Sequence, residues 1–340
     1  MSSVSIIVPV YNNAESLPEL HEHFCELANK NPGDAFEFIF VDDGSRDHSL
    51  AALVTLSQKD GRVRVIKLSR NFGSNAALLA GLNQARGDVV AAIAADLQDP
   101  PELIHEMLDA WRGGRKVVLA ARESREDGLA SLLSDTFYKL FRAFAIKSMP
   151  KHGFDFFLID RQVVDLINHI QENNAYLMGL ILWLGFDPQV FHYHRQKRQK
   201  RFGRSAWTFW KKLKYFIDSF VAFSYFPVRA ASVIGFSLST IGLIYALAVI
   251  FMRLVYAIEV EGWTSLMVVL LIVSGAQMIM IGIVGEYLWR NLDETRRRPR
   301  FIIDHVIGGD QGDSTKAGPA WAEPAEAEPA EAEPTEAESA

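Results

Sequence analysis

The clearest candidates for chemistry in this chain are carboxylates and amides that follow apolar runs. Asp96 and Gln98 belong to the run Asp-Leu-Gln-Asp-Pro-Pro-Glu at residues 96–102. These are oxygen ligands of the kind that a hard divalent cation prefers, so the run predicts a metal and diphosphate site. A second run, Asp-Asp-Gly-Ser at residues 42–45, fits either a turn or cap or a ligand site.

Alternating strands and helices must position these side chains. Strands are expected at residues 4–10, 36–41, 63–68, 89–94 and 116–121, with helices between them. This alternation predicts an α/β fold whose mainly parallel sheet has helices on both faces. Ligands gather at the carboxyl ends of strands in such sheets. Tyr11, Asp43 and Asp96 all fall at strand ends, which favours a ligand site over a cap.

Two uncharged stretches, residues 230–252 and 263–285, follow this first half. A hydrocarbon core of roughly 30 Å needs about 20 apolar helical residues, and each stretch meets that length. Residues 195–214, just before them, carry nine Lys or Arg and no acid, interleaved with aromatics. This pattern is typical of an interfacial helix on an anionic leaflet. A membrane surface is therefore the expected partner, and no nucleic-acid partner is expected, because nucleic-acid binding has no use for two spans.

The Lys and Arg residues that flank the two apolar stretches also predict how these stretches are oriented in the membrane. Basic residues flank both outer ends of the two stretches, so the positive-inside rule places both termini in the cytoplasm. At the inner end of the second stretch, Glu286 is spaced to pair with Arg290. No basic n-region with an apolar h-region opens the chain, so a cleaved signal is not expected.

The net negative charge of the chain comes from one segment. The chain carries −6, and residues 310–340 hold nine acids and one lysine, so the rest carries +2. This Ala-Glu-Pro segment has almost nothing to bury and is expected to be disordered. The single cysteine, Cys25, excludes an internal disulfide or a multi-cysteine metal site. It falls in an expected amphipathic helix, where packing is its simplest role.

Three motifs carry a family resemblance: residues 5–12 (Ser-Ile-Ile-Val-Pro-Val-Tyr-Asn), 41–45 and 95–102. Together they resemble glycosyltransferase family 2 with the GT-A nucleotide-diphospho-sugar transferase fold. Gly-Phe-Asp-Phe at 153–156, the basic loop near Gly203 and Gly-Glu-Tyr at 285–287 extend this resemblance to the polyprenyl-phosphate glycosyltransferases. That group includes relatives of dolichol-phosphate mannose synthase, bactoprenol glucosyltransferases and undecaprenyl-phosphate aminoarabinose transferases.

The resemblance implies a nucleotide-sugar bound over the sheet edge, with ionised Asp43 accepting hydrogen bonds from hydroxyls. Asp96 and Gln98 would hold Mg²⁺ or Mn²⁺, which neutralises the leaving diphosphate. Many relatives have Asp-x-Asp in this motif, but Ala94 replaces the first acid here, so more ligands must come from diphosphate and water. The residues implied around the nucleotide-sugar are Pro9, Tyr11, Asn13, Val41, Asp43, Ala95, Asp96, Gln98, Arg122 and Arg198.

Five residues are implied in catalysis. Arg122 occupies the position from which relatives direct an arginine at phosphate, the alternative being a surface arginine. Asp155 matches the acid near the acceptor; because the acceptor phosphate is already anionic, positioning is favoured over a general-base role. Lys200 and Arg201 lie in the loop that closes over both phosphates, where cations lower their repulsion. Relatives often have lysine at the position of Ala206, so Arg198 and Arg204 are alternatives for this contact. The catalytic candidates are Asp96, Asp155, Arg122, Lys200 and Arg201.

The prediction is a membrane-bound inverting glycosyltransferase at the bacterial cytoplasmic membrane. UDP-glucose or a UDP-N-acetylhexosamine is the expected donor and undecaprenyl phosphate the expected acceptor; related membrane enzymes also form homo-oligomers such as tetramers. The expected segments are a catalytic domain at 1–204, interfacial helices at 205–228, two transmembrane helices at 229–290, a juxtamembrane segment at 291–309 and the acidic tail at 310–340.

Three alternatives remain. A processive polysaccharide synthase usually has more spans and a Gln-x-x-Arg-Trp motif, which this sequence lacks. A non-catalytic membrane scaffold would explain Ala94 but not the retention of Asp43, Asp96 and Gln98. A dinucleotide-binding oxidoreductase is disfavoured, since the first strand ends in Pro-Val-Tyr-Asn rather than a glycine-rich turn.

Overall fold

A computed structural model describes most of the first 194 residues, two long helices and the segment that follows them. The described residues are 1–123, 139, 142–143, 146–170, 172, 176–194, 226–256 and 262–309.

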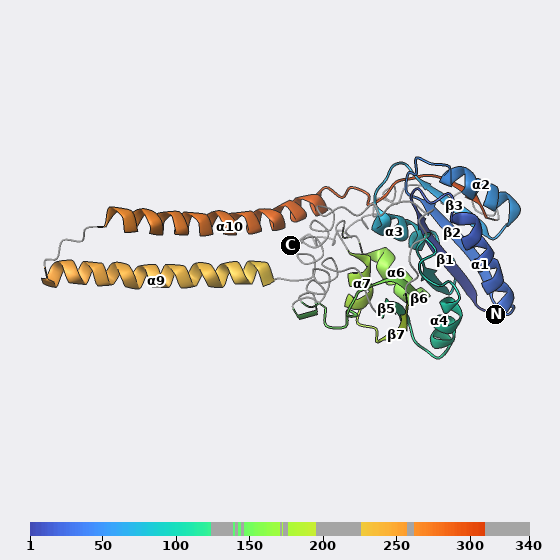
Figure 1. Cartoon of the computed structure of the whole chain (residues 1–340), viewed down its shortest axis with the longest axis horizontal. Helices are drawn as coiled ribbons and strands as arrows, with labels where there is room; N and C mark the ends of the chain where they lie inside the picture. Colours follow the sequence, from blue (N-terminus) through green and yellow to red (C-terminus); the bar gives the residue numbers. More distant parts are fainter. Residues whose placement is uncertain are drawn as a thin grey trace, which may run out of the picture. The chain divides into compact units, whose positions relative to one another are not determined.

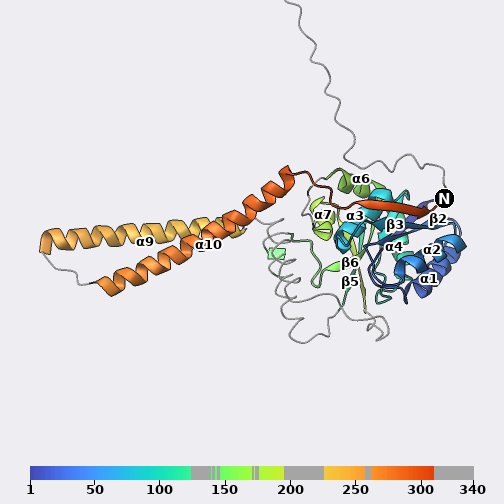
Figure 2. The same cartoon turned by 90° about the horizontal axis from the view of Figure 1, so that it is seen from above.

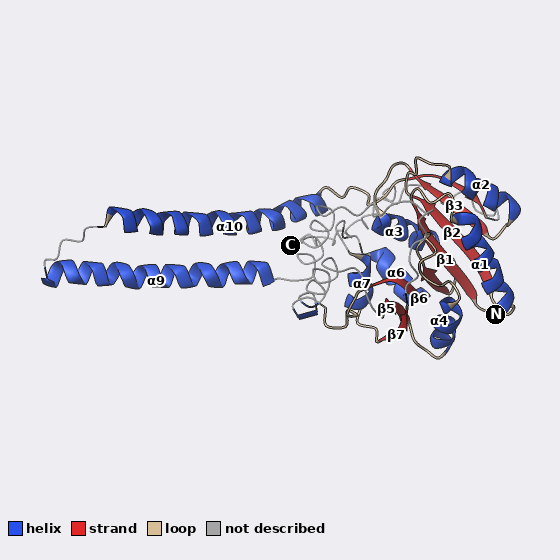
Figure 3. Cartoon of the chain, viewed as in Figure 1, coloured by secondary structure: helices blue, strands red, loops and turns tan. Residues whose placement is uncertain are grey.

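One eight-stranded sheet organises the described part of the chain (Figures 1 and 3). Its strand order is β7-β5-β6-β4-β1-β2-β3-β8. The strands are β1 (Ser3–Val10), β2 (Ala35–Asp42), β3 (Val63–Leu68), β4 (Val89–Ala92), β5 (Val117–Arg122), β6 (Phe154–Asp160), β7 (Pro188–Tyr193) and β8 (Ile303–Gly308).

Strands β4, β1, β2 and β3 run parallel, as the sequence predicts, and β5 pairs parallel with β7. Strand β6 is antiparallel to both β4 and β5. Since β6 reverses direction once on each side, β5 runs parallel to β4. The carboxyl ends of β1, β2, β4, β5 and β7 therefore share one edge of the sheet, and the α/β, mainly parallel fold is confirmed.

Helices cover both faces of this sheet. The helices are α1 (Leu17–Lys30), α2 (Ser49–Lys59), α3 (Ser74–Gln84), α4 (Leu103–Arg112), α6 (Arg161–His169), α7 (Leu177–Trp183), α9 (Phe226–Tyr256) and α10 (Trp263–Thr295). Alternate strand residues point to opposite faces, so Phe38 and Phe40 join the core under α1, α2 and α4. Ile39 and Val41 join the core under α3, α6 and α7.

Close packing of α3 on β1 depends on a glycine. A Cβ at Gly81 would lie 2.4 Å from Cγ2 of Ile7, which is fully buried. A side chain there would push α3 away from the strand that leads into the loop at Tyr11. Gly81 thus lets the helix lie against the sheet beneath the candidate site.

The two long helices contain the apolar stretches. The most apolar 18 residues of Val228–Phe251 have a mean hydropathy of 2.2, and those of Leu266–Thr295 have one of 2.5. Both helices are long and apolar enough to cross a membrane. Neither is buried inside the protein, unlike the core helix of a soluble domain. The predicted pair forms on α10, where Arg290 Nη2 lies 3.3 Å from Glu286 Oε1.

Strand β8 is a feature that the sequence did not predict. It follows α10 and pairs antiparallel with β3, so the chain returns to the edge of the sheet (Figure 2). Ser69 N donates to Ile302 O at 2.9 Å, and Lys67 Nζ lies 2.7 Å from Asp304 Oδ2. The end of the expected juxtamembrane segment, Ile303–Gly308, is therefore part of the sheet that carries the candidate site.

Candidate active site

The loops after β1 and β2 form one hydrogen-bonded unit. Asn12, with a left-handed φ of 54°, accepts at Oδ1 from Arg46 N at 2.8 Å. Its own N–H donates to Ser45 Oγ at 3.1 Å, and Asn13 N donates to Ser49 Oγ at 2.9 Å. These bonds fix the backbone on which Tyr11 stands.

The residues expected around the nucleotide differ in accessibility. Pro9 and Val41 are direct neighbours in the parallel register of β1 and β2. Val41 is fully buried as a whole residue, so neither its side chain nor its backbone is exposed to a ligand in this structure. Tyr11 is 36% exposed, and Asn13 Oδ1 accepts from Tyr11 N at 3.4 Å. The exposed tyrosine ring is thus available to a ligand at the sheet edge.

Asp43 joins the β2 loop to the loop after β3. Its Oδ1 accepts from Phe72 N at 2.7 Å and its Oδ2 from Gly73 N at 2.9 Å. Burial raises the pKa of the Asp43 carboxyl, against the lowering effect of these two N–H donors. A carboxylate offers about four acceptor positions, and these two donors use two of them. Asp43 is only 3% exposed, so a ligand hydroxyl would have to reach it from the edge of the sheet. The role expected for Asp43 is therefore compatible with this contact, which sequence reasoning did not predict.

The close contact between the loops after β2 and β3 explains why the Asp-Asp-Gly-Ser motif has a glycine at position 44. Gly44 has a φ of 69°, and a Cβ there would lie 2.7 Å from Asn71 N. Both the left-handed backbone and the close approach require glycine. The motif therefore brings the β3 loop against the β2 loop.

The Asp96 loop begins after β4 and is anchored to the start of α1. Ser16 Oγ donates to Ala95 O at 2.6 Å. Leu97 has a left-handed φ of 55°, and Gln98 N donates to Asp96 Oδ1 at 3.3 Å. This tight turn places the Gln98 backbone beside the Asp96 carboxylate, and the shared metal-binding role of the two side chains stays a prediction.

These two residues fit a hard cation through one carboxylate and one amide oxygen. Asp99 does not add a second carboxylate, because it is only 1% exposed and is bound by a tyrosine of β7. In the described part of the chain, no cluster of three His, Cys, Asp or Glu ligands includes Asp96. A cation here would take most of its ligands from diphosphate and water.

A charged cluster crosses the ends of β5, β6 and β7. Arg122 Nη2 lies 2.7 Å from Asp155 Oδ2, and Tyr193, opposite Arg122 in the register, donates to Asp99 Oδ1 at 2.5 Å. Arg122 is 15% exposed and Asp155 58%, so Asp155 faces solvent while Arg122 lies beneath the surface. Asp155 is thus the member of the pair that a ligand can reach directly.

Burial and the neighbouring groups of this cluster shift the pKa values of Arg122 and Tyr193. Burial alone would lower the pKa of Arg122, but Asp155, Asp99 and Tyr193 raise it overall. Burial and the nearby Asp99 charge raise the pKa of Tyr193. The cluster thus holds a permanent cation beside Asp155. Sequence reasoning did not identify Tyr193. The residues that end at it, Pro-Gln-Val-Phe-His-Tyr, are not a clear apolar run and gave no strong signal for a strand.

Several expected residues lie outside the described part of the chain. They are Arg198, Lys200, Arg201 and Arg204, with the rest of the basic segment 195–214, most of the expected interfacial helices and the tail 310–340.

This mainly parallel sheet, with its polar loops gathered at one edge, agrees with the GT-A fold that the sequence motifs predict. Residues 5–171 match the model of glycosyl transferase family 2. An uncharacterized glycosyltransferase of Synechocystis is 36% identical over 308 residues, covering 90% of this chain and 96% of that protein. The bactoprenol glucosyl transferase of Shigella phage SfV is 35% identical over 302 residues, covering 88% and 97%. The chain therefore belongs to glycosyltransferase family 2.

Among solved structures, a mannosyltransferase from Pyrobaculum calidifontis in complex with GDP-Man and Mn²⁺ has a TM-score of 0.40 and 17% identity, covering 57% of each chain.

Proposed function

We propose that this protein transfers a sugar from a nucleotide-sugar to polyprenyl phosphate, with inversion, at the cytoplasmic face of a bacterial membrane. The proposed donor is UDP-glucose or a UDP-N-acetylhexosamine, and the proposed acceptor is undecaprenyl phosphate. The similarity to bactoprenol glucosyl transferase, over 88% of this chain, supports this assignment. A match of that length must include most of α9 and α10.

One observation carries the proposal: a polar site at the sheet edge and two unburied apolar helices belong to the same chain. A water-soluble acceptor would give the protein no use for those helices. A lipid acceptor would require such helices, because its phosphate is held at the bilayer surface and the enzyme must meet it there.

In the proposed reaction, an oxygen of the lipid phosphate attacks the anomeric carbon on the face opposite the diphosphate. The bond between that carbon and the diphosphate oxygen breaks, and the nucleoside diphosphate leaves with the electron pair. The attacking phosphate is already anionic, so Asp155 is assigned to positioning rather than proton removal. The Arg122–Asp155 pair would orient the acceptor, and Asp43 the donor hydroxyls.

Asp96 and Gln98 are the residues that would hold Mg²⁺ or Mn²⁺, which supplies charge neutralisation of the leaving diphosphate when bound. Lys200 and Arg201 remain the proposed contacts to the reacting phosphates, with Arg198 and Arg204 as alternatives. Two anionic phosphates approach one another, so cations between them would lower the barrier.

The test is incubation of membranes containing the protein with a panel of labelled UDP- and GDP-sugars and undecaprenyl phosphate. We expect label from one donor to enter the organic phase as a lipid-linked monosaccharide. Membranes with the Asp96→Asn protein serve as the control. Label in a polymer would favour a processive synthase, and no transfer from any donor would refute the proposal.

A further inference from the structure

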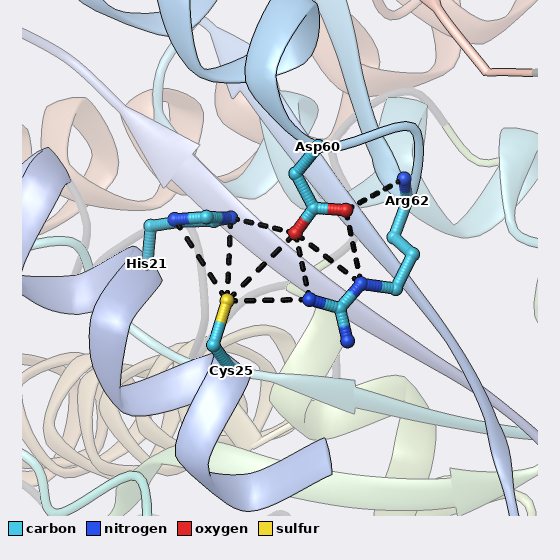
Figure 4. Close-up of polar contacts among 4 residues, drawn as sticks. All are labelled: His21, Cys25, Asp60 and Arg62. Atoms are coloured by element: carbon cyan, nitrogen blue, oxygen red, sulfur yellow. Dashed lines mark hydrogen bonds and ion pairs between the residues drawn. The ribbon is translucent and has the colours of Figure 1, made fainter. Parts of the chain in front are cut away.

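Away from the candidate active site, an imidazole, a thiol and a carboxylate lie together (Figure 4). His21 and Cys25 are four residues apart on α1 and share one face of the helix. Asp60 follows α2 directly. Among the residues that the structure describes, these three form the one cluster of metal-ligating side chains whose ligand atoms all lie within 4.8 Å of one another.

The cluster is separate from the candidate active site. Asp60 lies just before β3, at the amino end of that strand, whereas Asp43 and Asp96 follow the carboxyl ends of β2 and β4. The side chains of His21 and Asp60 are 14% and 13% exposed, so they are shielded yet reachable by an ion.

We propose that His21, Cys25 and Asp60 bind a thiophilic divalent cation of the Zn²⁺ class. Tetrahedral zinc with its usual bond lengths places such ligand atoms roughly 3.4–3.6 Å apart. Here Cys25 Sγ lies 3.6 Å from His21 Nε2 and 3.8 Å from Asp60 Oδ2. His21 Nε2 and Asp60 Oδ2 are 2.9 Å apart, and Cys25 Sγ is also 4.0 Å from His21 Nδ1, so the sulfur lies beside the imidazole ring. Binding therefore requires Nε2 and Oδ2 to separate by about half an ångström and the His21 ring to turn so that Nε2 points at the ion. Sulfur and imidazole nitrogen together select zinc-like ions over Mg²⁺.

Arg62 is the cation that now satisfies this cluster. One of its terminal nitrogens, Nη2, donates to Cys25 Sγ at 3.2 Å and to Asp60 Oδ2 at 2.8 Å. Its Nε donates to the other oxygen, Asp60 Oδ1, at 2.9 Å. A bound ion would displace the two Nη2 contacts and the longer Nε contact to Asp60 Oδ2 at 3.2 Å, and the Arg62 side chain, 39% exposed, has solvent to turn toward.

After that displacement, Arg62 Nε would remain on Asp60 Oδ1 and orient the carboxylate toward the ion. Binding would release the Cys25 thiol proton to solvent, and His21 would bind as neutral imidazole through Nε2. Water would complete the fourth position. Arg62 and the ion therefore compete for the same two atoms, and removal of Arg62 Nη2 should strengthen ion binding.

The test is a Co²⁺ titration of the full-length, tag-free protein in detergent, followed by absorption spectroscopy. Cys25 is the only cysteine, so a thiolate-to-cobalt charge-transfer band reports on this site alone. The oxygen ligands of Asp96 and Gln98 produce no such band. We expect a band that saturates at one equivalent, is displaced by Zn²⁺ and is absent in Cys25→Ser.

Four further variants sharpen the test. His21→Gln and Asp60→Asn should each weaken Co²⁺ binding by about 10–100-fold or more, since even outer-shell changes cost that much. Arg62→Gln should tighten it. His23→Gln is the matched control, because His23 is also on α1 but pairs with Glu102 outside the cluster. Zn²⁺ should raise the thermal unfolding midpoint of the wild-type protein and leave that of Cys25→Ser unchanged.

Two results would overturn the proposal. One is the lack of a thiolate band in both the wild-type and Arg62→Gln proteins while both unfold cooperatively. The other is a band of equal affinity in His21→Gln and Asp60→Asn, which would show a lone thiol binding cobalt. Neither readout depends on glycosyl transfer, so the experiment on this ion site and the experiment on the proposed reaction are independent of each other.

Discussion

At the scale of single residues, Asp96 carries the acidic part of the candidate metal site. Position 94 is an alanine and offers no second carboxylate, and Asp99 accepts a hydrogen bond from Tyr193. Asp96→Asn should therefore reduce turnover by about 10²-fold or more, because a major charge ligand contributes several kcal/mol to transition-state stabilisation. The measurement is lipid-linked product formation, with Asp109→Asn on α4 as an exposed-carboxylate control. Near-normal turnover of Asp96→Asn, or full activity in chelator, would remove the metal assignment.

The hydrogen bonds of the Asp47 carboxylate lead us to expect that the stability of the fold depends on pH. Its two oxygens accept from Ser49 N at 3.0 Å and Ala14 N at 3.2 Å, joining the β1 and β2 loops. Burial would raise the pKa of Asp47, but the hydrogen bonds from Ser49 and Ala14 lower it overall. A lowered folded-state pKa stabilises the fold above the unfolded value of about 3.9, and this contribution is lost as pH falls below it.

Asp47→Asn should therefore make thermal unfolding less sensitive to acid between about pH 5 and 3. The measurement is the unfolding midpoint of both proteins across that range. Parallel profiles would show that the Asp47 hydrogen bonds do not favour its charged form.

Tyr193 provides a prediction about the Arg122 cluster. Tyr193→Phe removes the donor to buried Asp99, and an unsatisfied buried acceptor costs about 1–3 kcal/mol. We expect a loss of that size in the free energy of unfolding and a lower kcat, since Arg122 lies in the same cluster. The control is Tyr245→Phe, which removes the hydroxyl of an exposed tyrosine on α9. An unchanged free energy of unfolding would refute the structural role of Tyr193.

The sequence predicted single residues where a local pattern was enough. Asp43 and Asp96 stand at strand ends because apolar runs stop there, and their spacing from those runs was readable. The hydrogen bonds from the Phe72 and Gly73 N–H groups to Asp43 could not be predicted from the sequence, because they depend on β2 and β3 being neighbours in the sheet. The Tyr193–Asp99 bond joins residues 94 positions apart and depends on the full strand order.

At the scale of elements, the first five strands and four helices follow from the sequence. Strand β3 begins and ends where its apolar run does, and β4 ends two residues before the expected limit, where the chain turns toward Asp96. Strand β8 could not be predicted in this way. Only two of its six residues are isoleucine and one is valine, and its partner β3 lies more than 200 positions earlier.

The β8 pairing gives an element-scale prediction. Truncation after Gly309 should leave stability and turnover unchanged, because the removed segment has almost nothing to bury. Truncation after Arg300 should instead expose the edge of β3, whose unpaired N–H and C=O groups promote aggregation. The measurement is the monodisperse yield and unfolding midpoint of the two detergent-purified proteins. Equal behaviour would show that β8 is dispensable.

At the scale of the whole molecule, β8 limits how the chain can lie in a membrane. The sheet contains residues from both sides of the helical hairpin: β1–β7 precede α9 and β8 follows α10. A strand pairs with β3 only if both are in the same compartment. An even number of crossings between them is therefore required, and two helices satisfy this requirement.

Reporter fusions test this arrangement. Fusions at the N-terminus and after Gly309 should report the cytoplasm, and fusions between α9 and α10 the opposite side, as flanking charges also favour. Deletion of α10 should leave one crossing and move a reporter after Gly309 to the outer side. That deletion should also abolish sugar transfer, because β8 would be separated from β3. An intact wild-type protein whose Gly309 fusion reported the outer side would contradict the β3–β8 pairing and the proposed access to a cytoplasmic nucleotide-sugar together.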